Sequence, residues 1–173
     1  MDSQAFTLFH VVISVSGIGF GFMVVYGLLT ANLKGILTAL FLVTTALTSL
    51  SGFFFHRAHI LPSHIVGAVS LVAFAVTALA LYAYRLRGKW RMAFIVGVTL
   101  SLYFNVFVLV AQAFLKVASL HALAPNGSEP PFAVTQAVVL LVFVVIGLTA
   151  TRRFRPVASP HFSAGLTPGA SPR

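Results

Sequence analysis

Histidine is the residue type whose spacing in this sequence is most typical of a binding site. His56 and His59 are three residues apart, so on a helix their imidazoles lie one turn apart. His64 follows shortly afterwards, beyond Pro62. Three converging neutral imidazole nitrogens, with water as a further ligand where needed, suit Zn²⁺ or Cu²⁺. The pattern predicts a metal site formed by His56, His59 and His64.

A second arrangement uses histidines from two different segments. Bis-imidazole ligation of a b-type haem requires two histidines at similar depth on different helices. His10 and His64 meet this requirement, because each lies within about two turns of the same end of its hydrophobic run. The 17 Phe and 4 Tyr residues are enough to enclose a porphyrin. The ordinary alternative is that these histidines lie at the membrane interface and bond headgroups and helix ends.

The remaining composition excludes several other kinds of chemistry. The chain of 173 residues contains no Cys, which excludes disulfides, thiol catalysis and iron–sulfur clusters. Its only carboxylates, Asp2 and Glu129, lie outside the apolar runs. Paired-carboxylate catalysis and intramembrane acid relays are therefore excluded, and Mg²⁺ or Ca²⁺ sites are disfavoured. Any chemistry would then depend on histidines, neutral polar groups or a bound cofactor, and the composition favours a non-enzymatic protein over an enzyme.

The elements that position the histidines are predicted to be transmembrane helices. Hydrophobic residues make up 59% of the chain and charged residues only 8%, whereas a soluble domain carries about 25% charged residues. Five apolar runs are long enough to cross a bilayer, and in lipid each must be helical to satisfy its own backbone hydrogen bonds. These runs are residues 5–29, 36–55, 62–84, 92–117 and 132–150. We expect an all-α integral membrane bundle of five helices in residues 1–155, its first helix retained because no basic residue precedes it.

The basic residues predict how this bundle lies in a membrane. Of the 11 Lys and Arg residues, nine fall on one side of five alternating spans, and only Arg57 and Lys116 fall on the other. The positive-inside rule then predicts an N-out, C-in topology with the basic side against anionic cytoplasmic lipids. Because the cations flank apolar spans, the net charge of +9 does not indicate nucleic-acid binding. Residues 156–173, rich in Pro, Ser and Gly, are predicted to form a disordered cytoplasmic tail.

Small and polar residues form stripes along the predicted helices. Gly17 and Gly21 give the first helix a small-x-x-x-small pattern, which permits close packing with a neighbour. On the third helix, His64 aligns with Ala68 and Ala75. Since polar side chains are costly in lipid, we expect these stripes to face the interior of the bundle.

Together the stripes predict a polar pocket in the outer third of the bundle. Its walls are predicted to be His10, His56, His64, Gln112 and Gln136, with Asn105 as the deepest polar side chain. We expect a haem or another small ligand to contact His10, His64, Asn105, Gln112 and Gln136.

Four stretches resemble a group of small bacterial inner-membrane proteins. They are Phe9-His10, Leu61-Pro62-Ser63-His64, residues 103–110 (YFNVFVLV) and residues 124–132 (APNGSEPPF). The similarity covers most of the five spans but not the tail. The resemblance implies a multi-pass protein of the bacterial cytoplasmic membrane, and it implies no activity.

Two classes of function follow from the sequence. The first is a non-enzymatic membrane protein that binds a metal, a haem or a small ligand in the outer pocket. The second is an accessory subunit whose small-residue faces dock a larger membrane complex or a second copy of the chain. Small-solute permeation is weaker, because no charged residue lies at mid-span and no inverted repeat is visible.

Overall fold

The computed structural model describes residues 4–54 and 62–155, and all of the regular structure in these ranges is helical. The elements are α1 (Gln4–Leu29), α2 (Gly35–Phe53), α3 (Pro62–Ala78), the π-helical turn η1 (Leu79–Ala83), α4 (Lys89–Lys116), α5 (Ala118–His121) and α6 (Pro130–Arg153). Five segments are long and apolar enough to cross a membrane: α1, α2, the run from Val66 to Ala83, α4 and α6. The prediction of an all-α bundle with five membrane-spanning helices is confirmed.

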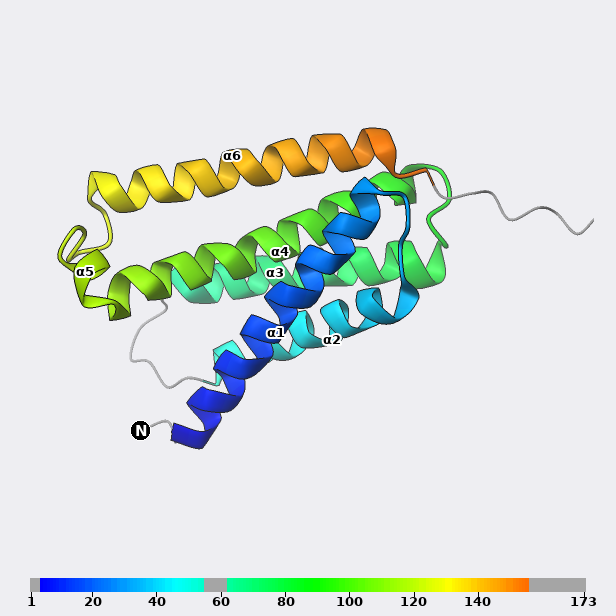
Figure 1. The fold of residues 1–173 in the computed structure, drawn as a ribbon. Coiled ribbons are helices and arrows are strands. Elements are labelled where there is room, and N and C mark those ends of the chain that lie inside the picture. Colours follow the sequence, from blue (N-terminus) through cyan, green and yellow to red (C-terminus); the bar gives the residue numbers. More distant parts are fainter. Residues whose placement is uncertain (1–3, 55–61, 156–173) are drawn as a thin grey trace, which may run out of the picture.

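Helix α4 is the centre of the arrangement. It packs against α1, α3 and α6, while α2 packs against α1 and α3. Helix α1 runs obliquely, so that its amino-terminal part lies beside α2 and away from α6 (Figure 1). The short helix α5 lies in the connection between α4 and α6, outside the five predicted spans.

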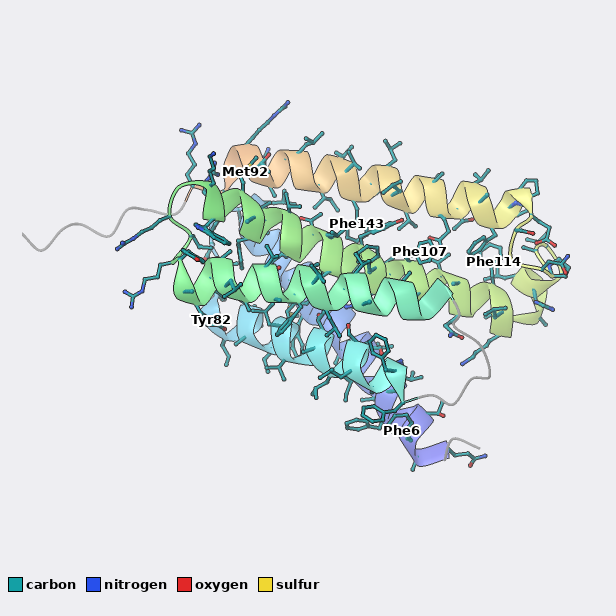
Figure 2. The ribbon with its side chains drawn as sticks, turned by 180° about the vertical axis from the view of Figure 1, so that it is seen from behind. Phe6, Tyr82, Met92, Phe107, Phe114 and Phe143 are labelled. Carbon is teal, nitrogen blue, oxygen red and sulfur yellow. The ribbon has the colours of Figure 1, made fainter. Side chains whose placement is uncertain are left out.

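The two ends of the bundle differ strongly in charge. One end, called here the basic end, carries eight of the described cations: Lys34, Arg85, Arg87, Lys89, Arg91, Arg152, Arg153 and Arg155. Side chains tipped with nitrogen project from the end of the bundle that carries Tyr82 and Met92 (Figure 2). The opposite end, called here the α5 end, carries Lys116, His121 and Glu129, the last being the only acidic residue in the described ranges.

The apolar core occupies the half of the bundle nearer the basic end. Its largest fully buried side chains are Val24, Leu28, Phe41, Phe94, Ile95, Val98 and Leu102. Phe143 and Phe154 of the α6 segment complete the same cluster. Outside this cluster, α6 exposes valine and leucine side chains that suit contact with acyl chains.

The predicted close packing of α1 through Gly17 and Gly21 is confirmed. A Cβ atom on Gly17 would lie 3.0 Å from Thr44 Oγ1 of α2. A Cβ on Gly21 would lie 2.5 Å from Leu102 Cδ1 and 2.8 Å from Phe41 Cε2. Glycine therefore allows α1 to pack tightly against α2 and α4 at these two positions.

The predicted inward face of α3 is wrong. Ala68 and Ala75 are exposed, whereas Ser70, Ala73 and Thr77 are buried. Alanine has little preference between lipid and protein, so the alanine stripe did not determine the rotation of this helix.

The carboxyl-terminal end of the third span departs from a regular α-helix. Residues Leu79–Ala83 form a π-helical turn, and Arg85, Leu86 and Gly88 then adopt positive φ angles of 48°, 59° and 53°. The rings of Tyr84 and Trp90 stack at 3.7 Å across this connection. The connection thereby turns the chain from α3 into α4 at the basic end.

Candidate functional site

Three polar contacts between helices lie in the middle and in the α5-end half of the bundle. His10 of α1 contacts Ser51 of α2, and Asn105 of α4 contacts Thr45 of α2. Gln136 of α6 contacts the backbone of α4. Buried Thr38, Thr77 and Thr99 lie nearer the basic end, so buried polar residues occur along most of the bundle.

The contact between His10 and Ser51 orients an imidazole ring. The distance between His10 Nδ1 and Ser51 Oγ is 2.7 Å, and Ser51 Oγ donates a hydrogen bond of 3.1 Å to the carbonyl oxygen of Thr48. When the hydroxyl proton of Ser51 is directed at that carbonyl, its oxygen accepts a hydrogen bond from His10 Nδ1–H. In that arrangement the neutral ring carries its proton on Nδ1.

The register of the α1–α2 hairpin explains this pairing. Gly17 lies opposite Thr44, and His10 and Ser51 each lie about two turns further from the short connection. In an antiparallel pair, equal steps along the two helices bring these residues to the same level. The His10 ring lies near Gly52, where a Cβ atom would be 3.9 Å from Cε1.

The second contact joins α4 to α2 near the middle of the bundle. Asn105 Nδ2 donates a long hydrogen bond of 3.5 Å to Thr45 Oγ1. Thr45 is fully buried and Asn105 is partly buried. This contact places the predicted deepest polar residue against α2, the helix that also carries Ser51.

The third contact joins α6 to α4. Gln136 Nε2 donates a hydrogen bond of 3.0 Å to the carbonyl oxygen of Phe107. Among the described residues, three buried oxygens lack a hydrogen-bond partner: Gln136 Oε1, Thr48 Oγ1 and Ser101 Oγ. Buried polar groups of this kind are usually satisfied by ordered water or by a ligand.

The predicted site residues differ in how deeply the structure buries them and in whether it describes them. Gln136 is buried and His10 half-buried, whereas Gln112 is exposed on α4. His56 and His59 lie outside the described residues, and His64 lies in the first turn of α3 with its side chain outside the description.

The described contacts involve three different pairs of helices, α1–α2, α2–α4 and α4–α6. Within residues 4–54 and 62–155, no group of three His, Cys, Asp or Glu residues is placed to hold a metal ion. The predicted metal and haem ligands therefore remain predictions.

No known protein family, curated protein or solved structure matches this chain. Its function must therefore be inferred from the chemistry of its own residues.

The sequence pattern gave no signal for Ser51, the hydrogen-bond partner of His10. Counting equal steps outward from the contact between Gly17 and Thr44 places Ser51 opposite His10, but that contact is known only from the structure.

A carboxylate is fixed by the loop that leads into α6 at the α5 end. Glu129 Oε1 accepts hydrogen bonds from the backbone nitrogen and Nδ2 of Asn126, at 3.0 and 2.8 Å. Glu129 Oε2 accepts another from the backbone nitrogen of Ser128, at 3.0 Å. These bonds, that from the backbone of Asn126 above all, lower the pKa of Glu129 to about 2.

We expect this loop to lose order as the pH falls from about 4.5, the ordinary pKa of the group, to about 2. The pKa of Glu129 is lower in the folded protein, so its stabilising effect is complete above the ordinary value and is lost once both states are protonated. Amide hydrogen exchange of Asn126 and Ser128 in micelles measures the effect. In Glu129→Gln this protection should be low throughout the range. If the two amides were as strongly protected in Glu129→Gln as in the wild type at every pH, the carboxylate would not be what orders the loop.

Proposed function

We propose that this protein is a non-enzymatic, multi-pass membrane protein that binds a transition metal or a b-type haem through imidazole at the α5 end. The observation that carries this proposal is the hydrogen-bonded series from His10 through Ser51 to the Thr48 carbonyl. A metal-ligating histidine nearly always donates its other ring N–H to a protein acceptor, which fixes the tautomer and the ring orientation. Ser51 provides such an acceptor for His10.

The ligating atom in this proposal is His10 Nε2. Its proposed partners are His64, on a different helix, for a haem, or additionally His56 and His59 for Zn²⁺ or Cu²⁺. Support comes from topology, because α2 ends and α3 begins at the same end of the bundle as His10 (Figure 1). The buried oxygens of Thr48 and Gln136 lack a partner in the structure, and such groups are usually satisfied by ordered water or by a ligand.

We further propose that the basic end faces the cytoplasm of a bacterial cell, so that the site opens toward the outside. The clustering of eight described cations at one end supports this orientation through the positive-inside rule. In the opposite half, exposed Lys116 is the only described Lys or Arg residue.

We expect the purified protein to carry a Soret absorbance band or a stoichiometric transition metal after expression with added haem precursor, zinc or copper. His10→Ala should remove the bound group, because the ligating nitrogen is lost. Ser51→Ala should weaken binding by about 10- to 100-fold, because the ring loses the group that orients it. Absorbance spectra, elemental analysis and titration of the stripped protein in mild detergent measure these effects.

His121→Ala is the matched control, because His121 is exposed on α5 at the same end of the bundle. This variant should bind as the wild type does. Wild-type protein that stays colourless and metal-free after supplementation would refute the proposal. Equal losses in His121→Ala and His10→Ala would show that binding is not specific to the His10 position.

A further inference from the structure

A groove with a volume of about 400 Å³ lies at the basic end, between the end of α1 and the start of α2. The side chains that matter for its chemistry are Phe22, Met23, Tyr26, Asn32, Lys34 and Leu37. Its volume falls within the range of small-molecule sites, about 300–1,000 Å³. The groove is far from the polar contacts of the α5-end half and plays no part in the proposed imidazole site.

The lining of the groove changes from polar to apolar along the axis of α1. Asn32 and Lys34 belong to the connection at the end of the bundle, whereas Phe22 and Met23 lie about two turns inside α1. An amphipathic molecule aligned with the helices would therefore meet polar groups at one end and hydrocarbon along the rest. This is the arrangement of a phospholipid in a bilayer.

Close backbone packing shapes the polar end of the groove. The backbone nitrogen of Asn32 donates a hydrogen bond of 2.8 Å to the carbonyl oxygen of Gly27. A Cβ atom on Gly27 would lie 2.8 Å from the Asn32 carbonyl oxygen, so a side chain there would push the connection away. Ala31 adopts a left-handed φ of 54°, which turns the chain toward α2. The connection is thereby held close over the end of α1.

Charge identifies the kind of lipid that suits this groove. Lys34 is exposed, and the only acidic residue in the described ranges, Glu129, lies at the opposite end of the bundle. The ammonium group of Lys34 thus has no carboxylate nearby among the described residues. A phosphate that carries a net negative charge would complement it, whereas a zwitterionic headgroup brings a second cation that Lys34 repels.

We propose that this groove binds one anionic phospholipid. Its phosphate lies against Lys34 and Asn32, and one of its acyl chains lies along Phe22, Met23 and Leu37. This inference goes beyond the proposed imidazole site and is independent of it, because the two sites share no residue.

Fluorescence quenching by brominated lipids tests the proposal in the full-length chain. A Trp90→Phe background removes the single native tryptophan, and Met23→Trp places a reporter in the groove. In mixed vesicles, brominated phosphatidylglycerol should quench this reporter with a binding preference about fivefold over brominated phosphatidylcholine. Lys34→Gln should remove most of that preference, because the charge that selects the phosphate is lost.

Leu148→Trp in the same background is the matched control reporter. Leu148 lies on α6 toward the basic end and is 56% exposed, close to the 54% of Met23, but it does not line the groove. Its lipid preference should be weaker and unchanged by Lys34→Gln. An equal preference at the two positions would overturn the proposal in favour of general attraction to the basic end. A preference at Met23→Trp that survives Lys34→Gln would overturn it as well.

Discussion

Replacing Gly97 with alanine is expected to destabilise the bundle by about 1–3 kcal/mol, the usual cost of overpacking. Gly97 of α4 faces Thr77 of α3, and a Cβ atom there would come closer to Thr77 Oγ1 than real Cβ atoms do. Thr77 is fully buried, and its hydroxyl donates a hydrogen bond of 2.6 Å to the Ala73 carbonyl. The side chain therefore cannot yield without losing that bond, and α3 must move away from α4. Reversible unfolding in mixed micelles measures the loss.

The partner substitution makes this prediction specific. Thr77→Ala removes the oxygen that blocks the new methyl group, so Gly97→Ala combined with Thr77→Ala should recover most of the lost stability. Gly19→Ala is the control, because a Cβ on Gly19 would meet nothing within 4 Å. Its effect should stay within about 0.5 kcal/mol. A Gly97→Ala protein as stable as the wild type, or one that Thr77→Ala does not rescue, would contradict the packing described for α3 and α4.

Removing the guanidinium of Arg91 is expected to release the end of α6 and to cost about 1.5–3 kcal/mol, the range for hydrogen bonds to charged groups. Arg91 Nη1 donates to the carbonyl oxygens of Thr151, at 3.1 Å, and of Phe154. Carbonyls at the end of a helix lack partners within the helix, and a cation there also complements the helix dipole. Phe154 is buried, and its ring lies 6.5 Å from that of Phe94, so release of the cap also disturbs the core. Unfolding in mixed micelles and hydrogen exchange in the last turn of α6 measure Arg91→Ala.

Two further variants separate this cap from the general charge of the basic end. Arg91→Lys keeps the positive charge but loses the planar guanidinium, so an intermediate loss of stability is expected. Arg87→Ala removes an exposed cation from the connection before α4 and should change stability little. If Arg87→Ala were as destabilising as Arg91→Ala, the effect would belong to net charge rather than to the α6 cap.

The sequence by itself determined that the chain forms five membrane-spanning helices. An apolar run of about 20 residues in lipid has one way to satisfy its backbone within the same segment, and that requirement overrides the strand preference of Val, Ile and Phe. The predicted run 5–29 accordingly corresponds to α1 (Gln4–Leu29), and 132–150 to α6 (Pro130–Arg153). The separation of charge between the two ends followed from the same alternation, because every second span returns the chain to the same end of the bundle.

Only the tertiary structure decided how each helix is rotated and which side chains meet. Ala68 was predicted to face inward and is exposed, because the contact of Gly97 with Thr77, and not the alanine stripe, sets the buried face of α3. His10 shows the same division. Its place near the start of the first span could be inferred from the sequence, but its pairing with Ser51 depends on the register of the α1–α2 hairpin. Lipid accepts apolar side chains on every face, so hydrophobicity cannot determine this register, and close packing between helices must do so.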